Sequence, residues 1–220
     1  MSLRPRADVA PADWFVQSQA NWQDLVGFGP PGFDSYARVF FEVDEDGDLR
    51  SDHEVFADLV SVVAAHTSTP DDAFFGLWDG YSDIHGGDRL GYVFFGPGAR
   101  ALAALSRLTR PLRRRIPPAF APEVIDGPKV VVENREFYLF SGPLAHAGDW
   151  GAAPIRPGWG RDISTPSLMW PADHAWFVAS DTDPDWIGVG GSEDLITALL
   201  TDPRLDAETA VYGLDYPESR

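Results

Sequence analysis

The chain has 220 residues, 34 of them acidic and 17 basic, which gives a net charge of −17, and it contains no cysteine. A chain of this length can bury the core of one domain, and 44% hydrophobic residues with eight tryptophans exclude a disordered protein. Disulfides, thiolate catalysis and cysteine-based zinc sites are excluded as well, and no run approaches the ~18 apolar residues of a membrane span. We therefore expect a cytoplasmic protein that does not bind membranes.

The first expected element is a flexible N-terminal segment, residues 1–12, which has no apolar periodicity. A single domain then covers residues 13–220. Apolar side chains recur at helical spacing over residues 13–26, and the sequence GFGPPGF ends that predicted helix. Residues 36–43 are rich in β-branched and aromatic side chains, so they predict a strand, and DEDGD predicts the turn that follows it.

The clearest predicted helix starts after Ser51. Ser51 and Glu54 have the spacing of a capping box, in which each side chain bonds the other residue's backbone amide. An apolar stripe follows at helical spacing, made of Val55, Phe56, Leu59, Val60 and Val63. We expect this stripe to pack against a sheet.

Strand-like and helix-like runs alternate irregularly along the rest of the chain. The strand-like runs are residues 73–78, 90–95, 129–133, 136–140, 174–180 and 186–191. Helices are expected at about residues 99–110 and after Ser192, which stands in the N-cap position. Adjacent strands mixed with isolated helices predict an α+β fold: a largely antiparallel sheet packed with three to four helices in a single domain.

The sequence SDIHGGD, residues 82–88, looks like the metal-binding loop of calcineurin-type metallophosphoesterases. Those enzymes need further ligands, including an Asn-His pair, and neither Asn21 nor Asn134 precedes a histidine. We interpret the sequence as a polar glycine-rich loop, and we expect no metal and no cofactor. The alternative is a metal-dependent hydrolase or a small-molecule-binding enzyme that uses Asp83, His85, Asp88 and His174.

Aspartates cluster in two sequences that we interpret as hairpin turns. Residues 42–48 carry carboxylates at the spacing of a calcium loop, but His53 stands where the bidentate glutamate belongs. The second cluster, at residues 181–185, is followed by Trp186 where the loop needs glycine. Aspartate is frequent in such turns because it accepts hydrogen bonds from nearby backbone amides. Weak calcium binding is the alternative.

Codon bias or a high-salt habitat is the favoured source of this acidity. The alternative is a functional acidic surface, which would attract a basic protein as the partner and repel nucleic acid. On that alternative, Asp44, Asp46 and Asp48 contact the partner. The eight tryptophans are expected to lie mostly in the core, and the alternative for Trp176 and Trp186, in the last predicted hairpin, is that they line a binding pocket together with His174.

The stretch SLMWPADHAWFVASDTDPDWIGVGGSEDLITALLTD, residues 167–202, together with LWDGY and YLFSGPL, resembles a family of uncharacterised actinobacterial proteins. This resemblance implies a GC-rich bacterial source and a cytoplasmic location, and it brings no activity or site residue. In size, acidity and aromatic content the chain also resembles the immunity proteins that neutralise basic bacterial toxins. We therefore expect a non-enzymatic interaction module.

Overall fold

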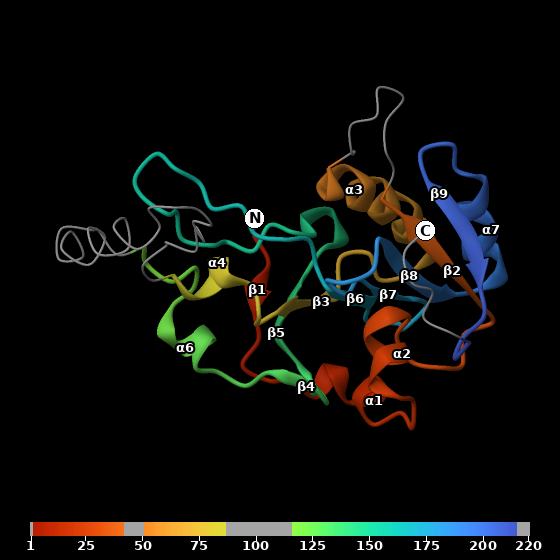
Figure 1. The fold of residues 1–220 in the computed structure, drawn as a ribbon, viewed down its shortest axis with the longest axis horizontal. Helices are drawn as coiled ribbons and strands as arrows, with labels where there is room; N and C mark the ends of the chain where they lie inside the picture. The colour runs from red at the N-terminus through yellow and green to blue at the C-terminus, as the bar shows by residue number, and fades with distance from the viewer. Residues whose placement is uncertain (1, 42–50, 87–115, 215–220) are drawn as a thin grey trace, which may run out of the picture.

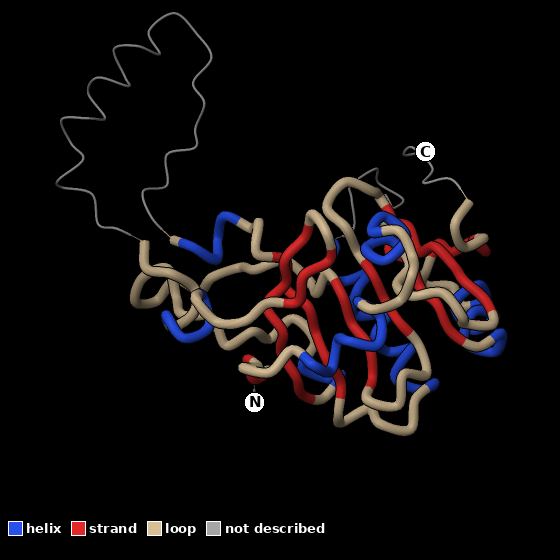
Figure 2. The backbone as a smooth tube through the Cα atoms, turned by 90° about the horizontal axis from the view of Figure 1, so that it is seen from below, coloured by secondary structure: helices blue, strands red, loops and turns tan. Residues whose placement is uncertain are grey.

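The strands form one antiparallel sheet, which Figure 2 shows with its strands side by side. The computed structural model describes residues 2–41, 51–86 and 116–214. Within these ranges nine strands pair in the order β1-β5-β3-β6-β7-β8-β2-β9, and β4 joins β5. The strands are β1 (Arg4–Pro5), β2 (Ser35–Phe40), β3 (Ala73–Trp78), β4 (Val130–Val132), β5 (Arg135–Gly142), β6 (Leu168–Pro171), β7 (Phe177–Ala179), β8 (Trp186–Gly191) and β9 (Asp206–Ala210).

Helices cover both faces of the sheet (Figure 1). On one face lie α3 (Asp52–Val63) and α7 (Glu193–Thr201), and on the other lie α1 (Asp13–Val16) and α2 (Trp22–Gly27). The remaining helices of the described residues are single turns: α4 (Ser82–His85), α6 (Pro122–Ile125) and the 3-10 helices η1 (Ala10–Ala12), η2 (Ala64–His66) and η4 (Leu144–His146).

The alternation of side chains along the central strands divides the core into two layers. In β6, Met169 packs into the cluster under α3 and α7, whereas Leu168 and Trp170 pack into the cluster over α1 and α2. Successive residues of a strand point to opposite faces, so both faces of the sheet are buried. The result is a single α+β domain with a largely antiparallel sheet, which confirms the predicted fold class.

The two longest described helices follow the local signals of the sequence. Ser51 caps α3 through the amide of Glu54, and the carboxylate of Glu54 accepts a bond from the Ser51 amide in return. Ser192 caps α7 through the amide of Leu195. The apolar stripe of α3 is buried as predicted except at Val60, which is half-buried, and Val62 joins the core in its place.

The N-terminal third differs from the prediction in two places. The segment predicted to be flexible is packed against the domain, since Leu3 is buried and β1 pairs with Phe140 and Ser141 of β5. The single helix expected over residues 13–26 is two short ones. α1 ends where the hydroxyl of Ser18 donates to the Phe15 carbonyl, and Asn21 begins α2 by capping the amide of Asp24.

Several predictions fall outside the described residues. They concern Asp44, Asp46 and Asp48 in the first acidic turn, Asp88, the strand at residues 90–95 and the helix at residues 99–110. Among the helices that are described, none has the length and apolar character needed to cross a membrane.

Candidate functional site

The sequence SDIHGGD begins with the single-turn helix α4, where we expected a loop. Nε2 of His85 lies 2.7 Å from the carbonyl oxygen of Asp79 and 2.9 Å from Oδ1 of the same residue. The backbone carbonyl of Asp83 accepts a hydrogen bond from the guanidinium of Arg161. His85 is therefore engaged within the protein through its side chain, and Asp83 through its backbone carbonyl.

His174 lies at the other end of β3 from His85. The amide of Ala172, close to His174, donates to the carbonyl of Asp72 just before β3, whereas His85 contacts Asp79 just after it. The six residues of β3 span about 20 Å. His85 and His174 therefore cannot bind the same metal ion.

The imidazole of His174 stacks on the indole of Trp14, with the ring centroids 4.1 Å apart and an angle of 11° between the planes. Burial lowers the pKa of His174, although the carboxylate of Asp173 opposes that effect. Nowhere in the described part of the chain do three His, Asp or Glu side chains gather as metal ligands would. Of the alternative metal site, the described residues Asp83 and His85 therefore lie apart from His174, and Asp88 lies outside the described residues.

The densest cluster of titratable groups surrounds Asp79. Its Oδ1 accepts from the phenol of Tyr138 at 2.5 Å and contacts His85, and its Oδ2 lies 2.5 Å from Nζ of Lys129. Nζ of Lys129 also lies 3.2 Å from Oε2 of Glu136, and it sits 5.1 Å from the centre of the Tyr138 ring. These groups are satisfied by one another.

The pKa shifts in this cluster follow from its burial and its hydrogen bonds. Burial alone would raise the pKa of Asp79, but hydrogen bonds from Lys129 and Tyr138 outweigh it and lower that pKa. Burial, together with the Asp79 carboxylate, raises the pKa of Tyr138 far above its usual value. A carboxylate with three donors is a weak base, and a phenol held protonated is a weak nucleophile. The cluster is therefore best suited to linking α4 and the residue before β4 to the sheet.

We expect Asp79→Asn to reduce the free energy of unfolding by about 1–3 kcal/mol at neutral pH, because hydrogen bonds to a charged group are replaced by weaker ones. The pKa of Asp79 is lowered on folding, so its contribution is complete above the unfolded pKa of about 3.9 and is lost as the pH falls through the folded pKa. Urea unfolding of wild type and variant, near pH 7 and again below that folded pKa, measures the difference in their free energies of unfolding. This difference should be smaller in acid. An equal difference at both pH values would mean that the Asp79 carboxylate does not stabilise the fold through these hydrogen bonds.

The tryptophans that the alternative placed in a pocket lie in the core, which corrects that alternative. Trp176 is 0% exposed and Trp186 is 2% exposed. Trp176 belongs to the cluster under α3 and α7, and Trp186 stacks on Phe28 on the opposite face. Neither indole is accessible to a ligand at the surface.

The aspartates of the second acidic turn take part in ion pairs. Oδ1 of Asp181 lies 3.1 Å from Nε of Arg135, and Oδ2 of Asp183 lies 3.7 Å from its Nη2. Arg135 is the first residue of β5, so these ion pairs link the turn to that strand. The geometry is that of a turn fixed by a guanidinium, in line with the interpretation as a hairpin.

A different tryptophan is exposed, at the tip of the loop between η4 and β6. Trp159 is 59% exposed and closes a four-residue turn that begins at Arg156. The amide of Trp159 donates to the Arg156 carbonyl at 2.9 Å, and Gly158 has φ +79°. Proline at the second position and glycine with positive φ at the third are typical of a type II turn, which fits Pro157 and Gly158.

The side chains at the ends of this turn are paired. The guanidinium carbon of Arg156 lies 3.7 Å from the centre of the Trp159 ring, a cation–π contact that orients both groups. The amide of Ile155 also donates to the carbonyl of Trp159 at 3.1 Å. The turn therefore presents an aromatic ring and a cation in one fixed arrangement.

The base of the loop is anchored to the domain. Arg161 donates to the backbone carbonyls of Ala153, Pro117 and Asp83, which come from three separate segments. On either side of the tip, Trp150 and Ile163 are buried in the main core. The exposed turn is therefore built on a fixed support, although loops are often mobile.

Most of the described basic side chains outside this loop are neutralised within the protein. Arg38 pairs with Glu208 at 3.0 Å, and Arg204 lies 2.9 Å from Asp58 and 2.7 Å from Asp202. Lys129 and Arg135 are paired as described above. Since the chain has twice as many acidic as basic residues, carboxylates remain in excess at the surface.

Comparison with known proteins assigns no function. No family model matches the chain, and no curated protein or solved structure matches it either. What the protein does is therefore inferred from its own geometry, in which the exposed Arg156–Trp159 turn contrasts with a titratable cluster that is satisfied internally.

Proposed function

We propose that the protein is a non-enzymatic interaction module that binds a basic protein: Trp159, on the Arg156–Trp159 turn, supplies the apolar contact, and the acidic residues of the chain supply the attraction to positive charge. The observation that carries this proposal is the exposed indole of Trp159 on a turn whose backbone and neighbouring cation are fixed. Trp and Arg are the residue types most enriched among those whose truncation weakens protein–protein binding. A ring already held in place loses little conformational entropy when it binds.

The acidic surface is the second part of the proposal. A net charge of −17 attracts a positively charged partner over a distance of about one Debye length, which accelerates association more than it tightens the complex. The acidic residues Asp44, Asp46 and Asp48, at a turn sequence outside the described residues, are proposed to add to this attraction. We place the protein in the cytoplasm as part of the same proposal, which fits a chain without cysteine.

We propose a non-enzymatic role because of the contacts in the Asp79 cluster. Asp79, Lys129 and Tyr138 are residue types that would serve as base, acid or nucleophile, yet Lys129 and Tyr138 each bind the carboxylate of Asp79 at 2.5 Å. A catalytic group needs its proton or lone pair directed at a substrate. Binding by the exposed turn requires no such group.

The proposal predicts that Trp159→Ala loses the partner. Wild type and variant are used as bait in parallel in a lysate of the source organism, and captured proteins are quantified by mass spectrometry. We expect at least one protein of high isoelectric point to be captured about tenfold less by the variant, since truncating a central aromatic costs about 2 kcal/mol or more. Raising the salt concentration should reduce its capture by wild type.

Val131→Ala is the matched control, because Val131 is 51% exposed on β4, away from the turn. It should capture the same protein as wild type does. The binding constant of the purified partner is then measured by calorimetry for all three baits. Equal binding by wild type and Trp159→Ala, or a partner without excess positive charge, would contradict the proposal.

A further inference from the structure

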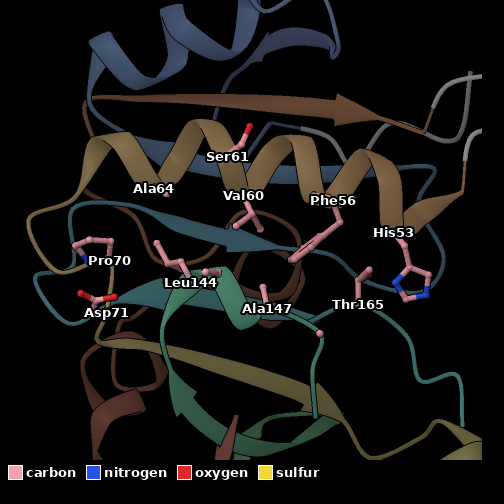
Figure 3. Close-up of a pocket in the computed structure, with 13 residues that line it drawn as sticks. His53, Phe56, Val60, Ser61, Ala64, Pro70, Asp71, Leu144, Ala147 and Thr165 are labelled. Carbon is pink, nitrogen blue, oxygen red and sulfur yellow. The ribbon is translucent and has the colours of Figure 1, made fainter. Parts of the chain in front are cut away.

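A cavity of about 450 Å³ opens beside α3 (Figure 3), and none of the residues of the Arg156–Trp159 turn lines it. One wall is α3, whose Phe56 and Val60 point toward Leu144 and Ala147 on the segment that begins with η4. This volume lies within the range of ~300–1,000 Å³ that is typical of small-molecule sites. The space is sufficient for a ligand and not merely for a water molecule.

The walls of the cavity are apolar and are made of side chains that the fold fixes. Phe56 is 3% exposed and Leu144 is 1% exposed, so both are core residues with one surface on the cavity. Val60 is the half-buried member of the α3 stripe, and the cavity explains why it is not covered by the core. Apolar walls of this kind favour an aliphatic group as the body of a ligand.

The two ends of the cavity are polar. At one end lies the carboxylate of Asp71, an exposed residue with which none of the described basic side chains pairs. At the other end, Nε2 of His53 lies 3.2 Å from Oδ1 of Asp162. The imidazole is therefore already matched to a carboxylate, and none of the described residues that line the cavity is a Lys or Arg. An anionic ligand would find no lysine or arginine among these described lining residues.

We propose that this cavity binds a small aliphatic amine. The ammonium group pairs with Asp71, and the carbon chain lies along Val60 and Phe56 toward Thr165 at the far end. The net charge of −17 raises the local concentration of cations around the protein, which favours the same class of ligand. None of the residues of the Arg156–Trp159 turn lines this site, but Asp162, which pairs with His53 at one end of the cavity, lies three residues after Trp159.

Octylamine, octan-1-ol and octanoate test the assignment, because they share one chain and differ only in the charge of the head group. Calorimetric titrations at low ionic strength should give the affinity order amine, alcohol, carboxylate. Shortening the amine to hexylamine should weaken binding about three- to fourfold for each methylene removed, the usual effect of burying that group. Octylamine that binds no more tightly than octanol, or a carboxylate that binds as well, would overturn the proposal.

Asp71→Asn and its neighbour Asp72→Asn separate a specific contact from general attraction to an acidic protein. Asp71 lines the cavity and Asp72 does not, and both are exposed, so neither change threatens the fold. We expect Asp71→Asn to weaken the binding of octylamine about two- to fivefold, as for a solvent-exposed ion pair, and to leave the binding of octanol unchanged. Asp72→Asn should leave the binding of both ligands unchanged. Equal losses of octylamine binding in the two variants, or no loss in either, would overturn the assignment of Asp71.

Discussion

Leu59→Ala should reduce the free energy of unfolding by about 2–5 kcal/mol, the usual range for removing a core leucine side chain. Leu59 is 0% exposed and belongs to the cluster between α3 and the sheet. Its neighbours are held by the sheet on one side and by α7 on the other, so the space left by the side chain cannot close easily. The loss then combines the transfer free energy with the cost of a cavity.

Leu200→Ala is the matched control for this change. Leu200 is also a helical leucine, in α7, but it is 39% exposed. Its replacement should cost less than about 1 kcal/mol, since surface substitutions have small effects. Urea unfolding followed by circular dichroism measures both variants. Similar losses at the two positions would mean that α3 does not pack on the sheet through Leu59.

Gly188→Ala should be destabilising by about 1–3 kcal/mol or more, because the added methyl group has no space. Gly188 lies in the middle of β8, where α2 crosses the sheet. A Cβ atom at this position would overlap the backbone carbonyl oxygen of Gly27 at the end of α2. Backbone atoms cannot rotate away as a flexible side chain does, so β8 and α2 must separate.

Gly160→Ala supplies the comparison, because a Cβ atom there meets nothing within 4 Å. It should be neutral, or slightly stabilising through the reduced freedom of the unfolded chain. Thermal unfolding of the two variants measures the difference. If the Gly188→Ala variant were as stable as the Gly160→Ala variant, α2 and β8 could not be in close contact at Gly188.

The parts of the fold that were predicted from the sequence are those with local signals. The capping box of Ser51 and Glu54 starts α3, and the N-cap Ser192 starts α7. The hairpin of β4 and β5 was predicted as well, and its turn includes Glu133 with φ 39°, in the left-handed region that tight turns need. These elements depend on residues close together in the chain.

Elements that depend on distant contacts were not predicted. β9, Asp206–Ala210, has the sequence DAETA, which lacks the apolar and β-branched pattern of a strand. It forms because it pairs with β2 at the edge of the sheet. The same reason applies to β1, which pairs with β5, and to the break between α1 and α2.

The candidate site was missed because exposure is set by tertiary packing. Eight tryptophans were expected to lie mostly in the core, and nothing in the sequence separated Trp159 from Trp176 or Trp186. The signal that was present is the turn itself, since Pro157 and Gly158 stand between Arg156 and Trp159. A large aromatic side chain beside a Pro-Gly turn in a long loop is difficult to bury, so this pattern predicts an exposed ring.

Hydrogen exchange of the complex tests the central claim most directly. The protein is exchanged in deuterated buffer alone and with the purified partner obtained by capture, and the protection of each segment is compared by mass spectrometry. Contact through the Arg156–Trp159 turn predicts that residues 155–162 gain the largest protection, while segments such as β4 and α7 are unchanged. Protection confined to other segments, with no change over residues 155–162, would contradict it.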